Sequence, residues 1–414
     1  MNWGLYLPSP GEAAMIAFGL ALTGFAVRKG YEPLLLLPIG LGMVLVNLPL
    51  SPMREAHSFL GLLYQYGISN ELFPLLIFVA IGAMLDFKPL LERPWLVVFG
   101  AAGQIGIFGA LLAALIAGFP LFEAASIGVI GTADGPTSIV VASRLAPRIV
   151  GSVTLAAYSY MALVPLIQPP IMRLMTTRRE RAVRMPSSET GVPPVLLKVF
   201  PYTIILISAM LSPLSIPLIG TLMFGNILAT SGATESLAAS ARNTLASLVT
   251  LFLGIAVGST MRADIFLQTE TLLIFGLGLL AFIVSTAFGV GMGKILHALG
   301  VRVNPLIGAA GLSSFPMSAR LVQQLGREED KGNFLLMHAV SANVSGQIGS
   351  VLAGGVLLDL CIRTGDTTGV SEGLSILAGG MGKVLLGLVM IGLTVQVMKG
   401  FSRLRGKSGA EGGT

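Results

Sequence analysis

Apolar residues dominate the chain in a series of long segments that short polar stretches separate. Several segments are shorter than the roughly 20 residues that a straight membrane-spanning helix requires. A mixture of full-length and interrupted apolar segments is typical of membrane transporters. We therefore predict an all-α polytopic membrane protein, with membrane segments near residues 13–27, 33–50, 73–86, 95–118, 123–143, 149–172, 201–229, 242–260, 270–298, 304–323, 333–358 and 374–398.

The composition also favours a membrane protein. Hydrophobic residues make up 54% of the 414 residues and charged residues only 11%, whereas about 25% of a soluble domain is charged. The net charge of +6 comes from basic residues scattered over short loops, so we expect no nucleic-acid partner. A single cysteine, Cys361, excludes a disulfide within the chain and offers no thiolate cluster for a metal. The first apolar stretch lacks preceding basic residues, so we expect no cleaved signal peptide.

The longest polar interval, residues 172–194, is rich in arginine. The positive-inside rule therefore predicts that it is cytoplasmic. The basic C-terminal tail, 399–414, is predicted to lie on the same side and to be disordered. Both stretches are interpreted as topology signals that contact lipid headgroups. The arginines of the interval are Arg173, Arg178, Arg179, Arg181 and Arg184.

The two halves of the chain share patterns that indicate a structural duplication. "LIFVAIGAMLDF" (76–87) is similar to "LFLGIAVGSTMRADIF" (251–266), and the spacing of Gly131, Pro136 and Ser138 recurs at 311, 316 and 318. We expect inverted repeats, with two broken or re-entrant segments that meet near the midplane. The predicted division is N-terminal membrane helices (1–70), a first repeat unit (71–172), a basic cytoplasmic loop (173–198), a connecting Pro-broken membrane segment (199–241), a second repeat unit (242–358), a C-terminal membrane helix (359–398) and the tail (399–414).

This topology imposes a condition on the connecting segment. If 123–143 enters and leaves on one face, the basic loop falls on the cytoplasmic side, as its charge requires. If 304–323 is re-entrant too, segment 201–229 must make no single net crossing. Pro213 and Pro217 interrupt that segment.

Asp134 lies in "GTADGPTSIV" (131–140), where a carboxylate and a Gly-Pro pair interrupt an apolar stretch. One interpretation is a structural carboxylate paired with an arginine. The other is an ion or proton site, because ionisable residues within membranes usually mark transport pathways. The break frees carbonyl oxygens, which hard cations prefer as ligands. Without a cation, desolvation favours the protonated carboxyl, so such a group can exchange a cation for a proton.

The second break, residues 304–321, adds neutral oxygens from Asn304 and several serines. Gly308 permits close backbone approach there. Arg320 either extends to the membrane interface or faces the cavity and binds a carboxylate or tunes Asp134. Tyr160 is either an interfacial anchor or a functional residue deeper in the membrane.

Long stretches of the chain closely resemble the β subunit of sodium-pumping biotin-dependent decarboxylases, whose best-known members serve oxaloacetate, methylmalonyl-CoA and glutaconyl-CoA decarboxylases. The resemblance covers about residues 58–398. It rests on "GTADGPTSIVVASRLAP", "AAYSYMALVPLIQPPIMRLMTTRRERAVRMP", "ESLAASARNTLASLVTLFLGIAVGS" and "NPLIGAAGLSSFPMSARLVQQLGREEDKGNFLLMHAVSANVSGQIGSVLAGGVLL".

The resemblance implies a multi-pass subunit of a prokaryotic cytoplasmic (inner) membrane. Such a subunit receives carboxybiotin from a partner, releases CO2, takes up a proton from the outer face and exports Na+. The biotin is not attached to this chain. The implied partners are a carboxyltransferase or biotin-carrying α subunit and a small membrane γ (or δ) subunit. We also expect contacts with lipid and a homo-oligomer.

The resemblance further implies roles for individual residues, and it has two departures. Where this chain has "SAN" at 341–343 the family has "GPN", and where it has "SSFP" the family has "SAVP". In the family, the "GPN" position lies in a broken helix that supplies a ligand. The implied catalytic residues are Asp134, Tyr160 and Arg320; the residues implied for carboxybiotin are Ser313 and Arg320; and those implied for Na+ are Asp134, Asn304, Gly308, Ser313 and Asn343.

Two other functions remain open from the sequence. One is a secondary sodium-coupled transporter with the same inverted repeats and no decarboxylase activity. The other is a non-transporting membrane anchor for a cytosolic decarboxylase. Sodium-dependent CO2 release from free carboxybiotin would separate a pump from an anchor.

Overall fold

The computed structural model describes residues 6–29, 33–186, 191–314 and 317–411. Helices dominate these ranges, and no strand occurs in them. Eight of the described helices are long and apolar enough to cross a membrane, and two bent pairs raise the number to ten if each pair is one span. The prediction of an all-α polytopic membrane protein is therefore confirmed.

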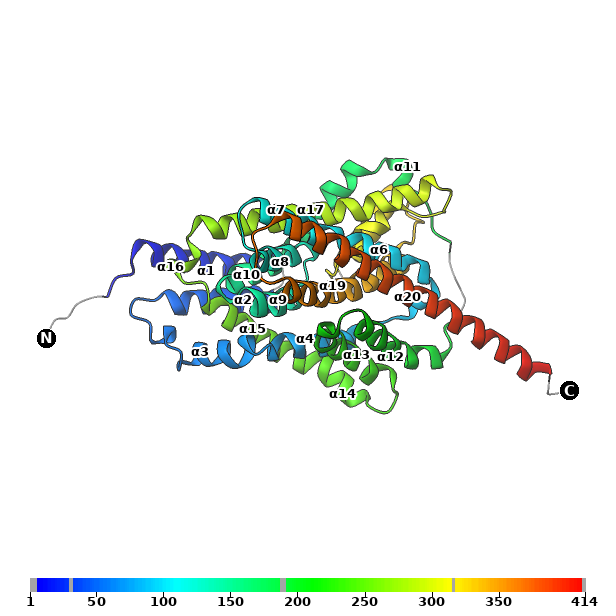
Figure 1. The fold of residues 1–414 in the computed structure, drawn as a ribbon, viewed down its shortest axis with the longest axis horizontal. Coiled ribbons are helices and arrows are strands. Elements are labelled where there is room, and N and C mark those ends of the chain that lie inside the picture. The colour runs from blue at the N-terminus through cyan, green and yellow to red at the C-terminus, as the bar shows by residue number, and fades with distance from the viewer. Residues whose placement is uncertain (1–5, 30–32, 187–190, 315–316, 412–414) are drawn as a thin grey trace.

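Most helices run along the long axis of the molecule (Figure 1). The first half contains α1 (Pro10–Lys29), α2 (Pro33–Asn47), α3 (Phe59–Leu63), α4 (Leu72–Met84), α5 (Lys88–Glu92), α6 (Val97–Gly103), α7 (Ile105–Ile116), α8 (Leu121–Val129), α9 (Gly135–Leu145) and α10 (Val150–Met175). The second half contains α11 (Arg178–Arg181), α12 (Pro194–Leu211), α13 (Ile216–Thr230), α14 (Glu235–Ser240), α15 (Ala246–Ser259), α16 (Ala263–Phe266), α17 (Thr269–Ala298), α18 (Met317–Glu329), α19 (Leu336–Thr364) and α20 (Val370–Glu411).

The connecting segment forms two helices. α12 and α13 each qualify as a membrane span, and they pack on each other. The turn between them is fixed by Ser212, whose hydroxyl donates to the Gly355 carbonyl at 2.9 Å. Segment 201–229 is thus not a single span, which satisfies the condition that the topology imposed.

The chain end also differs from the expectation. Residues 399–411, which we expected to belong to a disordered tail, continue α20 as helix. In Figure 1 this end of α20 projects away from the other helices.

The buried centre of the molecule is α19. Of its most apolar 18-residue window, 89% is buried inside the protein, although the helix carries many small and polar residues. α19 packs against α6, α9 and α20, and it lies in the middle of the bundle in Figure 1. Polar residues enclosed within a membrane protein usually have a functional role. α19 is therefore a candidate to carry part of the functional site.

A basic strap, residues 176–186, closes one end of the bundle. Arg181 pairs with Glu329 at 2.5 Å, and Arg184 pairs with Asp330 at 2.6 Å. The hydrogen bonds from Arg184 hold the pKa of the Asp330 carboxyl below its ordinary value. These pairs fasten the strap to the end of α18 and the residue that follows it.

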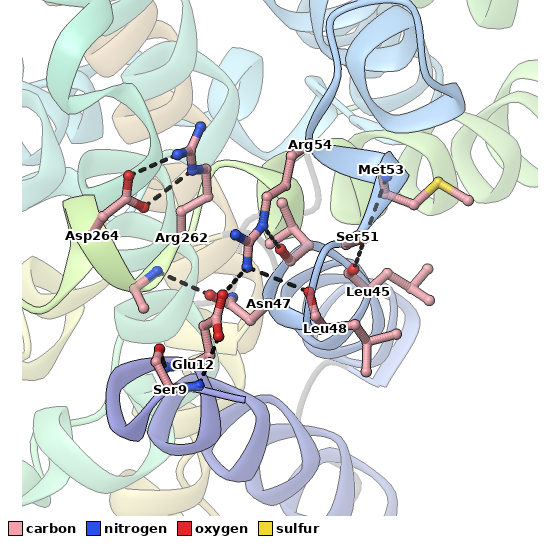
Figure 2. A network of polar contacts seen from close by, with 12 residues as sticks. Ser9, Glu12, Leu45, Asn47, Leu48, Ser51, Met53, Arg54, Arg262 and Asp264 are labelled. Carbon is pink, nitrogen blue, oxygen red and sulfur yellow. Dashed lines mark hydrogen bonds and ion pairs between the residues drawn. The ribbon is translucent and has the colours of Figure 1, made fainter. Parts of the chain in front are cut away.

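A second polar network closes the opposite end (Figure 2). Arg54 pairs with Glu12 of α1 and donates to the Val46 carbonyl at the end of α2. Asn47 donates to the Met261 carbonyl at 2.8 Å and accepts from the Ala263 amide at 2.9 Å. The network thereby joins the N-terminal helices to the junction between α15 and α16.

Two facing glycines set the distance between α17 and the 3-10 helix η8 (Pro305–Gly311). A Cβ added at Gly308 would lie 1.8 Å from the Gly289 carbonyl oxygen, and one added at Gly289 would lie 2.2 Å from the Gly308 oxygen. The backbones therefore touch directly, as small residues allow in membrane proteins.

We predict that Gly308→Ala lowers the thermal stability of the detergent-solubilised protein, because the added methyl group forces η8 away from α17. Overpacking of this kind costs about 1–3 kcal/mol. Gly291→Ala on α17 is the matched control, since an added Cβ there meets nothing within 4 Å. Equal melting temperatures for the two variants would contradict the prediction.

Candidate functional site

Asp134 lies at the first break. The chain leaves the 3-10 helix η4 (Ile130–Thr132), passes through Ala133 in the left-handed conformation (φ 53°) and enters α9. A non-glycine residue in this conformation is uncommon and costs about 1 kcal/mol or more. Asp134 caps α9, and its Oδ1 accepts the Thr137 amide at 3.1 Å. The following Gly-Pro pair suits the first turn of a helix, where proline loses no hydrogen bond.

The second break supplies a hydroxyl to the same carboxylate. Ser313 follows η8, and its Oγ lies 2.9 Å from Asp134 Oδ2. On the other side, α19 provides Gln347, whose amide donates to Oδ2 at 3.2 Å, and Ser350, whose hydroxyl donates to the same oxygen. Asp134 thus joins both breaks and the central helix at one point.

The Asp134 carboxyl has no cationic partner. It is only 3% exposed, and no lysine, arginine or histidine among the described residues forms an ion pair with it. The interpretation of a structural carboxylate paired with an arginine is therefore wrong for this part of the chain. A buried carboxylate held by neutral donors alone is costly unless a proton or a cation offsets its charge.

The hydrogen bonds of Ser313 also indicate that a proton or a cation is needed at Asp134. Its Oγ lies 2.9 Å from Asp134 Oδ2 and 2.7 Å from Gln347 Oε1. A hydroxyl has one hydrogen to donate, so it serves only one of the two oxygens. A proton on Asp134 would supply the second hydrogen, and a small cation would satisfy the same set of oxygens.

Gln347 and Ser350 were not among the predicted site residues. The sequence analysis chose Asn343 on this helix, and the two others lie four and seven residues further on. Residues at these spacings share one helix face. This spacing in a buried polar helix was the signal that could have found them.

The helix around Asn343 differs from the implied geometry. The resemblance suggested a broken helix, but α19 is continuous from Leu336 to Thr364. An alanine at 342, where the family has proline, keeps its amide hydrogen and so permits an unbroken helix. The Asn343 amide donates to the carbonyls of Ala310 at 3.2 Å and Leu312 at 2.7 Å. Its buried Oδ1 has no hydrogen-bond partner among the residues that the structure describes. Asn343 thus holds the second break beside Ser313.

Asn304 and Gly308 lie away from the Asp134 network. The Asn304 amide donates to the strap carbonyls of Arg181 at 2.8 Å and Val183 at 2.9 Å. Its Oδ1 accepts the Leu306 amide at 3.0 Å. The structure therefore places Asn304 where η8 meets the strap, and Gly308 at the contact with α17.

Tyr160 and Arg320 also make no contact with Asp134. Tyr160 is buried in α10, which bends by 62° just after it, and its hydroxyl donates to the Phe275 carbonyl. Arg320 lies exposed on α18 and forms no ion pair with a described residue. Pro316, part of the repeated spacing, lies outside the described residues.

The donor set suits a small hard cation. Within the described ranges, no group of three or more His, Cys, Asp or Glu side chains is placed to hold a metal ion. The Asp134 cluster instead offers one carboxylate, two hydroxyls and a carboxamide, which are oxygen donors of the kind that hard cations prefer. One formal negative charge matches a monovalent ion or a proton.

Comparison with known proteins identifies the family. Residues 11–361 match the family described as "Na+-transporting oxaloacetate decarboxylase beta subunit". The chain belongs to this family of decarboxylase β subunits. The expectation from sequence is thereby confirmed, and the chain is a membrane decarboxylase subunit.

Individual relatives carry three different names. The chain is 47% identical to the glutaconyl-CoA decarboxylase subunit beta of Acidaminococcus fermentans and 47% identical to the methylmalonyl-CoA decarboxylase subunit beta of Veillonella parvula, covering 84% of this chain and 92% of each relative. It is 40% identical to the oxaloacetate decarboxylase beta chain of Klebsiella pneumoniae, covering 86% of this chain and 96% of the relative. Such similar β chains therefore carry the names of decarboxylases for three different acids.

We predict that Gln347→Leu raises the sodium concentration for half-maximal decarboxylation by about tenfold, because one lost hydrogen bond to a charged group is worth about 1.5–3 kcal/mol. The readout is CO2 release from free carboxybiotin at graded sodium. Asn226→Leu is the control, since it removes a buried amide that binds only the Gly82 and Leu85 carbonyls. An unchanged sodium dependence in Gln347→Leu would exclude this amide from the site.

Proposed function

We propose that this chain is the membrane subunit of a decarboxylase sodium pump. It removes CO2 from carboxybiotin that a partner carries, and it couples this step and proton uptake to Na+ export. The observation that carries the proposal is Asp134, a buried carboxylate with neutral donors only, shared by both breaks and the central helix.

Sodium transport and proton uptake are coupled because Na+ and the proton bind the same carboxylate in turn. Asp134 needs a proton or a cation to offset its charge in a dry interior. Ser313 and Ser350 donate hydrogen bonds to the ionised carboxylate, and their oxygens can also face a cation. Gln347 contributes an amide hydrogen or, after rotation of its amide, a carbonyl oxygen. Exchange of Na+ for a proton therefore requires only local hydrogen-bond changes.

The decarboxylation step needs a place that strips water from the carboxylate of carboxybiotin. Loss of CO2 becomes easy once that carboxylate leaves water and a proton reaches the biotin ring. Arg320 is suited to attract the carboxylate, because it is exposed and unpaired within the described part of the chain. Ser313 lies at the start of the same segment, beside Asp134. Asp134 and Tyr160 are the proposed proton donors.

The remaining assignments concern sodium ligands and surroundings. Asn343 is proposed as a ligand because its buried Oδ1 lacks a partner. Asn304 and Gly308 would join the ligand set only if η8 moved relative to the strap. The proposed setting is the inner membrane of a prokaryote, with the strap on the cytoplasmic side. Apolar side chains on the surface of α17, such as Leu272 and Phe288, are suited to lipid.

The proposed partners are a carboxyltransferase or biotin-carrying α subunit, a small membrane γ (or δ) subunit and further copies of this chain. The rival assignment, a secondary sodium-coupled transporter without decarboxylase activity, is not favoured, because the similar proteins are named as decarboxylase subunits.

We predict that Asp134→Asn abolishes both sodium transport and carboxybiotin decarboxylation, while the protein is still inserted and assembled. The amide keeps the shape of the side chain but removes the charge and the exchangeable proton. Asp86→Asn is the control, because Asp86 is an exposed carboxylate whose Oδ1 accepts the Lys88 amide. The measurements are ²²Na⁺ uptake into vesicles and CO2 release.

Wild-type turnover by Asp134→Asn would refute the proposal. If Asp134→Asn loses both activities because it fails to assemble, Asp134→Glu is measured instead, since it keeps the negative charge. The proposal requires that variant to retain measurable coupled turnover with an altered sodium affinity.

A further inference from the structure

A cavity of about 630 Å³ lies between the starts of α10 and α17 and the loop that follows α2. A bulk water occupies about 30 Å³, so the cavity has room for about 20 waters. The lining residues furthest along the two long helices are Ser152 of α10 and Ile274 of α17.

The cavity and the basic strap lie at opposite ends of the same two helices. α10 begins at the cavity with Val150 and ends beside the strap with Met175. α17 begins at the cavity, and its Lys294, near the other end, donates to the Met175 carbonyl at 3.0 Å. The helices have 26 and 30 residues, enough to cross a bilayer. A cytoplasmic strap therefore places the cavity at the outer face.

The cavity is polar at its mouth and closes inward. At the mouth, Arg148 is 58% exposed and pairs with both Glu123 and Glu270. Arg54 and Arg262, which also line it, are held by their own carboxylates (Figure 2). All three arginines are thus neutralised, and the mouth does not repel cations.

The floor of the cavity is a contact between α10 and α17. Ser152 and Thr271 lie 3.3 Å apart at their hydroxyls and are nearly buried. Deeper along the same pair of helices, the Tyr160 hydroxyl donates to the carbonyl of Phe275, the residue after Ile274. The Tyr160 and Phe275 rings also meet edge to face, with centroids 6.4 Å apart.

The Tyr160–Phe275 contact lies beside the segment that leads to Asp134. A Cβ added at Gly278, one turn of α17 beyond Phe275, would lie 3.0 Å from the Tyr160 ring and 2.8 Å from the side chain of Ile130 in η4. On another face of α10, a Cβ added at Gly135 would lie 2.3 Å from the ring of Tyr158. Along α10 and α17, the Tyr160–Phe275 contact therefore lies between the cavity lining and the contact with η4.

We propose that this cavity is the outer aqueous vestibule of the Asp134 site, and that the Tyr160–Phe275 contact is its inner barrier. The vestibule admits water, protons and hydrated sodium ions from the outer face. The proposal rests on the proposed function for its direction, but the access of water to the cavity is a separate property.

The single cysteine makes a direct test possible. Cys361 is fully buried in α19, so the wild-type protein serves as an unreactive background. The probe is a permanently charged, membrane-impermeant methanethiosulfonate, applied from either side of oriented vesicles. We expect Ser152→Cys to react from the outer side at least about tenfold faster than Ser285→Cys, because thiol modification requires a hydrated thiolate. Ser285 is the matched control, since it is fully buried further along α17.

Gln268→Cys at the cavity mouth separates the two possible failures. If Gln268→Cys reacts only from the side of the strap, the proposed orientation of the pump is wrong. If Ser152→Cys then also reacts from that side, the cavity is still an aqueous vestibule. If Gln268→Cys reacts and Ser152→Cys reacts no faster than Ser285→Cys, the cavity is not an aqueous route and the proposal is overturned.

The inner barrier has its own test. Tyr160→Ala should let the same reagent reach a cysteine at Thr132, which is fully buried two residues before Asp134. Tyr160→Phe should keep that cysteine protected, because the ring remains. Protection of Thr132→Cys in both backgrounds would exclude the Tyr160–Phe275 contact as the barrier. Labelling is measured as the increase in protein mass by mass spectrometry, so the result does not depend on pump activity.

Discussion

One buried carboxylate without a counter-charge is the constraint on which this structure depends. In an interior that excludes water, the Asp134 carboxylate cannot stay ionised on four neutral donors without a large cost in free energy. No arginine or lysine of the described chain relieves that cost. The protein therefore needs a proton or a metal cation at this point, and this need is the basis for the proposal that Asp134 exchanges one for the other.

The architecture around Asp134 serves this requirement. The left-handed Ala133 and the Gly-Pro pair end one helix and start another, which leaves Asp134 at a helix N-terminus. The backbone contact between Gly289 and Gly308 holds the second break close, and Asn343 binds the carbonyls that flank Ser313. Elements far apart in the sequence thus converge on one oxygen atom.

Sequence reasoning predicted the membrane fold, the family and Asp134, because a carboxylate and a helix break in an apolar run are local signals. The family resemblance also implied that Ser313 acts together with Asp134 as a sodium ligand. It placed Asn304 at the same point, but Asn304 binds the basic strap, since tertiary contacts decide which residues of a break face inward. Gln347 and Ser350 were not selected, although their spacing of four and seven residues from Asn343 places them on the same face of α19. No pattern in the sequence indicated the cavity at the start of α10 and α17, because it forms between three separate stretches of chain, 46–65, 147–152 and 259–274.

The central claim is that sodium and a proton compete for the Asp134 carboxylate. The most direct test is the rate of carboxybiotin decarboxylation in oriented vesicles, measured over a grid of outer sodium concentration and outer pH. If sodium and the proton share one carboxylate, outer sodium slows the reaction and a lower outer pH relieves this inhibition. In one-for-one competition, the half-inhibiting sodium concentration rises by up to about tenfold for each unit by which the outer pH is lowered. Sodium inhibition that does not change with pH would show that the proton and the cation use separate residues, and would contradict the account.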